Sequence, residues 1–177
     1  MLYFKSPVRF VAVVWLSLAC VAPALADAPI SLQIGGQFPQ QTNARNAGGD
    51  AQYDLGLNYD FINAPVVPIQ ASFQFDDANG TNHGGSLNAF GFGLAGRLTT
   101  PLYAGMGLSV YHITANLAYP GAPSVTGTGI GTNIFAGDRV LSLPGGVNFS
   151  LQATYRQLPA LGGINASSIG VGLRVQL

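Results

Sequence analysis

Apolar and polar residues alternate along most of the chain after its first 26 residues. Tyr53, Leu55 and Leu57, for example, alternate with Asp54 and Gly56. A period of two is typical of β-strands whose two faces meet different surroundings. The pattern predicts eight strands, which centre on residues 30–35, 52–61, 69–76, 90–97, 102–111, 130–134, 147–156 and 169–177.

The spacing of these segments indicates a barrel that crosses a membrane. We expect strands of about nine to eleven residues, the length that a tilted strand needs to cross a bilayer. The sixth segment loses its alternation near Gly137, where a β-bulge would explain the change of phase. Long polar connections on one side and short turns on the other are typical of outer-membrane barrels. The predicted long connections are residues 39–50, 77–86, 117–126 and 158–166, and the shorter ones include residues 99–101 and 142–146.

The chemistry of the two faces indicates which one points outward. One face carries Gly, Gln, Ser, Asn and Thr with a few Asp and Arg, which suits a crowded polar interior, whereas the apolar face suits hydrocarbon. A barrel in lipid must close, because an open sheet edge would leave backbone groups unpaired, so we expect the last strand to pair with the first. A soluble periplasmic barrel is the alternative. Aromatic residues near predicted strand ends match the interfacial girdles of membrane barrels: Phe38, Tyr53, Tyr59, Phe61, Phe75 and Tyr155.

Composition and charge favour the membrane interpretation. The chain is 48% hydrophobic and only 8% charged, with a formal net charge of zero, whereas soluble domains carry about 25% charged residues. From Asp27 onward it has no Lys and no Glu. The absence of clustered Lys and Arg argues against nucleic-acid binding.

The first 26 residues have the features of a secretory signal peptide. Lys5 and Arg9 precede an apolar run over residues 10–21, and Ala24 and Ala26 are small residues at the expected cleavage positions. We therefore predict that residues 1–26 are removed and that residues 27–177 form a single barrel domain. The one cysteine of the chain, Cys20, lies in this signal, so we expect no disulfide in the mature protein.

The mature chain resembles the small eight-stranded outer-membrane barrels of the OmpA/OmpX class. The last strand is similar to the C-terminal assembly signal of that class, with Gly172 at its glycine position and Val175 and Leu177 at its terminal apolar positions. Leu177 departs from the pattern, since such barrels usually end in Phe. The resemblance implies an all-β, eight-stranded, antiparallel, up-and-down transmembrane β-barrel in the outer membrane, with both termini in the periplasm.

Two groups of residues are candidates for chemistry. His112 and Thr114 resemble the His-x-Ser of outer-membrane lipid A deacylases, but Thr replaces Ser and the mature chain has no Glu to orient the histidine. We favour an interfacial polar residue here, and no cofactor or metal is expected. The ionisable residues predicted to face the lumen and to fill it with salt bridges are Asp54, Asp60, Asp76, Arg97, Arg156 and Arg174.

These observations leave three functional hypotheses. The favoured one is a non-enzymatic barrel with a structural or surface-interaction role through its exterior loops. The second is a narrow passive pore for small solutes or ions, because inward glycines such as Gly91 and Gly105 leave some room. The third is a lipid A-modifying enzyme that uses His112 and Thr114. The expected partners are outer-membrane lipids, lipopolysaccharide and the outer-membrane assembly machinery, and the expected state is a monomer.

Overall fold

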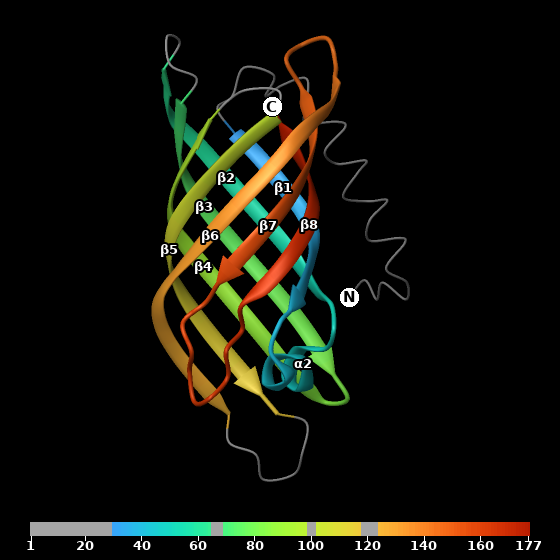
Figure 1. Cartoon of the computed structure of the whole chain (residues 1–177), viewed down its shortest axis with the longest axis vertical. Coiled ribbons are helices and arrows are strands. Elements are labelled where there is room, and N and C mark those ends of the chain that lie inside the picture. The colour runs from blue at the N-terminus through green and yellow to red at the C-terminus, as the bar shows by residue number, and fades with distance from the viewer. Residues whose placement is uncertain (1–29, 65–68, 99–101, 118–123) are drawn as a thin grey trace, which may run out of the picture.

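Eight antiparallel strands form a closed barrel (Figure 1). The computed structural model of the chain describes residues 30–64, 69–98, 102–117 and 124–177. A short helix, α2 (Thr42–Gly48), follows the first strand. The closed antiparallel arrangement of the strands confirms the predicted all-β, eight-stranded, up-and-down barrel. The strands are β1 (Ile30–Pro39), β2 (Gln52–Ala64), β3 (Ile69–Asn82), β4 (Gly85–Leu98), β5 (Leu102–Asn116), β6 (Val125–Ser142), β7 (Asn148–Gln157) and β8 (Ser168–Gln176).

The barrel closes through β1 and β8, as predicted. Gly35 lies opposite Gly172 and Gln33 lies opposite Arg174 in this antiparallel pair. A Cβ atom on Gly172 would lie 2.8 Å from the carbonyl oxygen of Ile34 and 3.2 Å from the Cα of Gly35. The two strands can therefore approach this closely only because both residues lack a side chain.

The two faces of the sheet differ as the alternation predicts. Leu102 is 71% exposed on the outside, whereas its neighbour Tyr103 is 7% exposed on the inside. Large apolar side chains cover the outer face of the described strands, among them Phe92, Met106 and Ile130. Burial of such a side chain away from water is worth about 1.5–3 kcal/mol, so a surface of this kind suits a lipid environment. A soluble barrel would have the opposite arrangement.

The strands on one side of the barrel are longer than the sequence indicates. Residues 77–86 were expected to form a long loop, but β3 and β4 stay paired up to Asn82 and Gly85. Only His83 and Gly84 make the turn, and both have positive φ (45° and 95°), as in type I′ hairpins. β6 likewise begins at Val125 and has 18 residues. The prediction of a long loop at 77–86 is therefore wrong. The predicted length of about nine to eleven residues holds for β1, β7 and β8, which have 10, 10 and 9 residues, but is wrong for the longer strands β2 to β6.

The predicted bulge in β6 is displaced. Gly137 pairs regularly with Tyr103, and the register against β7 shifts between Arg139 and Leu141 instead. A second irregularity, between Asp60 and Ile62 in β2, was not predicted. Both lie near the ends of long strands, where a bulge increases the local twist.

The connections divide the barrel into two ends (Figure 1). The end that carries α2, the β3–β4 hairpin and the β7–β8 connection is called the loop end. The opposite end, which carries the β6–β7 turn and the C-terminus, is called the turn end. The β6–β7 turn is tight, because Leu143 N donates to Val147 O at 2.8 Å. The predicted signal peptide and the predicted turn at 99–101 lie outside the described residues. In the part of the chain that is described, no helix has the length and apolar character to cross a membrane.

Candidate functional site

The lumen of the barrel gathers polar side chains from all eight strands. The six ionisable residues that the sequence places there are all buried on the inner face: Asp54, Asp60, Asp76, Arg97, Arg156 and Arg174. They do not form one cluster. They divide into a central group and a group at the turn end, and an apolar cap follows at the loop end.

Arg156 is the centre of the first group. Its guanidinium lies 2.8 Å from a carboxylate oxygen of Asp54 and 3.5 Å from one of Asp76. The Tyr111 hydroxyl donates to Asp76 at 3.0 Å, and the guanidinium carbon of Arg156 lies 5.9 Å from the centre of the Tyr111 ring. These contacts join β2, β3, β5 and β7 across the interior. Removal of one partner from a buried ion pair typically costs about 3–5 kcal/mol, because the other charge stays buried without a counter-charge.

Side-chain amides surround this ion-pair group. Gln33 and Gln37 of β1 each donate to Asp54 at 3.0 Å. Gln74 donates to the hydroxyl of Ser109 at 2.7 Å and accepts a hydrogen bond from Asn133 at 3.1 Å. These amides were not predicted to belong to the network. Their alternation with apolar residues does place them on the inner face of the sheet, so the sequence contains the information needed to find them.

The group at the turn end is centred on Arg97 and Arg174. Arg97 pairs with Asp60 at 3.2 Å and donates through Nε to Gln70. Arg174 donates to the hydroxyl of Ser31 at 2.5 Å. Its Nε is buried without a hydrogen-bond partner.

Inward glycines make room for large side chains. Added Cβ atoms on Gly91 and Gly131 would contact the ring of Tyr111, and one on Gly137 would contact the ring of Tyr103. The Tyr103 hydroxyl donates to Gln152 at 3.0 Å. These aromatic rings occupy space that the inward glycines open, which weakens the argument that glycine leaves a continuous path.

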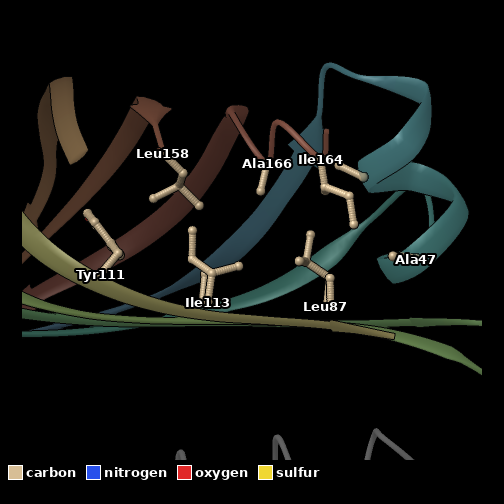
Figure 2. Packing of buried hydrophobic residues seen from close by; sticks show 10 residues of the cluster. Ala47, Leu87, Tyr111, Ile113, Leu158, Ile164 and Ala166 are labelled. Carbon is tan, nitrogen blue, oxygen red and sulfur yellow. The ribbon is translucent and has the colours of Figure 1, made fainter. Parts of the chain in front are cut away.

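An apolar cap covers the lumen at the loop end. The inward residues of β4 and β5 change from polar to apolar at this end, as with Leu87 and Ile113. Figure 2 shows Leu158, Ile164 and Ala166 opposite them, with Ala47 of α2 at the side of the cluster. The full cluster of buried residues is Ala44, Ala47, Leu87, Ala89, Tyr111, Ile113, Leu158, Ile164 and Ala166, with Ala115.

Helix α2 depends on this cap for its stability. It has only seven residues and no side-chain cap at its N-terminus, and isolated helices of this length are unstable in water. Its Ala44 and Ala47 are fully buried against the cluster. Asn82 of the β3–β4 hairpin donates to the carbonyl oxygen of Arg45 at 3.1 Å. The polar composition of residues 39–50 predicts a loop, and neither the helix nor the cap is visible in the sequence pattern.

The predicted assembly-signal residues lie on β8 and just after it. Gly172 lies opposite Gly35 where β1 and β8 close the barrel, a junction called the β1–β8 seam below. Their alternation with Arg174 and Gln176 puts Val175 and Leu177 in the apolar, lipid-facing phase, but both are buried, in a cluster with Val147. Phe149 lies opposite Val175 in the β7–β8 pair and packs against the same cluster, which explains their burial. Recognition by assembly machinery stays a prediction.

Comparisons with known proteins show which solved structures share this architecture. No family model matches the chain, and no curated protein matches it. Solved structures do match. The outer membrane protein Ail of Yersinia pestis, in a phospholipid bilayer nanodisc, has a TM-score of 0.54 and 13% identity, over 85% of this chain and 99% of that chain. Neisserial surface protein A has a TM-score of 0.55 and 12% identity, over 85% and 98%. The N-terminal β-barrel domain of Pseudomonas aeruginosa OprF has a TM-score of 0.53 and 14% identity, over 84% and 96%.

The chain has the fold of the small eight-stranded outer-membrane β-barrels. This confirms the resemblance stated from the sequence. At 12–14% identity the comparison establishes the fold alone.

His112 and Thr114 lie on the outer face of this small outer-membrane barrel, near the loop end of β5. The Nδ1 atom of His112 lies 3.1 Å from the hydroxyl of Thr128 on β6. Asp138 pairs with Leu102 at the opposite end of β5. The described partner of the histidine is therefore a hydroxyl and not a carboxylate, so a Ser-His-Asp type of arrangement is not formed here. Among the described residues, no group of His, Cys, Asp and Glu could hold a metal ion.

Proposed function

We propose that this protein is an outer-membrane barrel with a closed lumen, and that it acts without catalysis by presenting its loop end at the cell surface. The observation that carries the proposal is the double obstruction of the interior. The Asp54–Arg156–Asp76 group crosses the middle of the lumen, and the apolar cap covers the loop end. A filled interior suits a membrane anchor better than a channel, since eight strands leave space just wide enough for side chains.

Two features support the proposed orientation. The longer connections lie at the loop end, and both ends of the barrel sheet lie at the turn end (Figure 1). Outer-membrane barrels place longer loops outside the cell and short turns in the periplasm. In the proposed orientation both termini are periplasmic. The proposed surroundings are outer-membrane lipids and lipopolysaccharide, insertion by the outer-membrane assembly machinery is proposed as well, and the proposed state is a monomer.

The narrow pore and the lipid A-modifying enzyme are less well supported. A pore would need a path past Arg156 and through the cap, and both are tightly packed. An enzyme would need a base that is oriented by a carboxylate, whereas the described contact of His112 is Thr128.

Cysteine labelling in intact cells tests the proposal. The chain has no cysteine after Cys20, so a single introduced cysteine gives an unambiguous signal. Thr81→Cys lies at the loop end and Ser142→Cys at the turn end, and both positions are exposed. We expect a membrane-impermeant maleimide to label Thr81→Cys in intact cells and Ser142→Cys only after the outer membrane is opened. The reverse labelling order, or recovery of the protein in the soluble periplasmic fraction, would contradict the proposal.

A further inference from the structure

Formal charge is distributed unevenly along the lumen. In the central group one cation, Arg156, lies between two carboxylates, Asp54 and Asp76. At the turn end, Arg97 and Arg174 are accompanied by one buried carboxylate, Asp60. Arg139 adds a third cation, because it follows Asn133, Phe135 and Gly137 in the inward phase of β6. The turn end of the lumen therefore has an excess of positive charge.

Strand register brings two of these cations near each other. Arg139 of β6 and Arg174 of β8 both lie opposite Ser150 of β7, one on each side. With about 4.8 Å between neighbouring strands, their backbones lie about 10 Å apart. Arg139 is exposed at the end of the barrel, and Arg174 is 4% exposed deeper inside. The span between them suits a small group that both long side chains could reach.

The two buried arginines of the turn end share one carboxylate, because Asp60 pairs with Arg97 and also attracts Arg174. Arg97 pairs with Asp60, but no ion pair joins Arg139 or Arg174 to a described carboxylate. Asp138, the neighbour of Arg139, lies on the outward phase of β6 and is exposed. The Nε atom of Arg174 is buried without a partner, although the side chain donates to Ser31. Two buried guanidinium groups that share a single carboxylate are incompletely neutralised, which is unfavourable, and an added anion would complete their neutralisation.

We propose that the turn end of the lumen is a binding site for a small soluble oxyanion, with phosphate as the best match. Arg139 contacts the anion at the mouth, Arg174 binds it from inside, and Arg97 adds positive charge behind them. Guanidinium groups present paired N–H donors that match two oxygens of a phosphate, and such charge-assisted hydrogen bonds are stronger than those between neutral groups. The site adds a ligand to the barrel and does not depend on the surface role proposed above.

The test uses the folded mature chain in a maltoside detergent, which contains no phosphate. The mature chain has five arginines, so an Nε–Hε NMR spectrum has five side-chain signals to assign. We expect sodium phosphate, compared with sodium chloride at equal ionic strength, to shift the signals of Arg139 and Arg174 in a saturable way. The signal of Arg45, at the loop end, is expected to stay unchanged. Equal shifts with chloride, or no saturable shift, would overturn the proposal.

Two variants test the assignment of residues. Arg139→Gln removes a cation from an exposed position, and we expect it to weaken phosphate binding about ten-fold. Arg45→Gln is the matched control and should bind like the original chain. Ser150→Asp places a carboxylate between Arg139 and Arg174 and should abolish binding while the barrel stays folded. Unchanged binding in either Arg139→Gln or Ser150→Asp would contradict the proposed site.

A lipid arm separates a soluble anion from a lipid phosphate. The same spectra are recorded in nanodiscs of phosphatidylcholine alone and of phosphatidylcholine with phosphatidylglycerol, without added phosphate. The proposal predicts no shift of Arg139 or Arg174 between the two lipid compositions. A shift with the anionic lipid, together with none from free phosphate, would overturn the proposal in favour of a lipid headgroup.

Discussion

At the scale of single residues, buried charge determines how the lumen is organised. Arg156 is 1% exposed and contacts two carboxylates that come from different strands. Both carboxylates also accept hydrogen bonds from neutral side chains: Asp54 from Gln33 and Gln37, and Asp76 from Tyr111. This satisfies the anions well, and their dependence on one cation makes Arg156 the most sensitive residue of the network.

Replacement of Arg156 is expected to destabilise the barrel strongly. Arg156→Met leaves Asp54 and Asp76 buried without a cation, so the free energy of unfolding should fall by about 3–5 kcal/mol. Urea unfolding in lipid vesicles, followed by tyrosine fluorescence, measures this. A triple variant that also carries Asp54→Asn and Asp76→Asn removes the unpaired charges and should recover much of the loss. A single variant as stable as the original chain would show that the ion pairs are not important.

At the scale of elements, the loop-end cap and the β1–β8 seam stabilise different parts of the barrel. The cap orders α2 and the β7–β8 connection over the lumen. The seam closes the sheet through the contact of Gly35 with Gly172. Each can be disturbed alone, because neither Gly35 nor Gly172 belongs to the residue cluster that forms the cap.

The cap should control the accessibility of α2 to protease. Ala47→Asp places a charge in a fully buried position, so α2 should detach and trypsin should cut after Arg45 much faster. Asn46→Asp adds the same charge at an exposed neighbouring position and is the matched control. Cleavage is followed by mass spectrometry. Equal cleavage rates for the two variants would contradict a cap that holds the helix.

The seam should not tolerate a side chain at Gly172. A branched residue would collide with the backbone of β1, so Gly172→Val is expected to abolish barrel closure on refolding in detergent. Refolding without assembly machinery separates this packing effect from the predicted assembly signal. Gly96→Val is the control, because an added Cβ there has no atom within 4 Å. The measurement is the heat-dependent shift in gel mobility, and a normal shift for Gly172→Val would contradict the seam.

The sequence predicts the elements with local periodicity better than those that depend on tertiary contacts. The alternation around Asp54 and Arg97 locates strands and inward positions, because a period of two is a property of the strand itself. Residues 77–86 are rich in Asn and Gly and look like a loop, yet pairing between β3 and β4 keeps them extended. Helix α2 is too short to give a periodic signal and forms through burial of Ala44 and Ala47.

For a similar reason, the sequence alone does not predict which lumen charges pair with one another. Alternation places Asp54, Asp76 and Arg156 on the inner face, but it does not determine their relative heights. Those heights follow from strand register and from the tilt of strands in a closed barrel. The apolar inner positions Leu87 and Ile113 continue the same phase as polar ones, so the cap becomes visible only when the loops are in place.

At the scale of the whole molecule, the barrel has three layers along its axis. The apolar cap lies at the loop end, the ion pairs of Arg156 lie in the middle, and the arginine-rich group lies at the turn end. The outside is apolar over the described strands. This combination is that of a membrane-embedded barrel whose interior is filled by its own side chains.

The closed lumen is tested most directly by single-channel recording in planar lipid bilayers. The folded protein, selected by its heat-dependent gel mobility, is added to the bilayer, and a large general porin is recorded as the positive control. We predict no discrete conductance steps from this protein under conditions in which the porin inserts and conducts. Reproducible unit steps that increase in number with added protein would contradict the closed barrel and would favour the narrow pore.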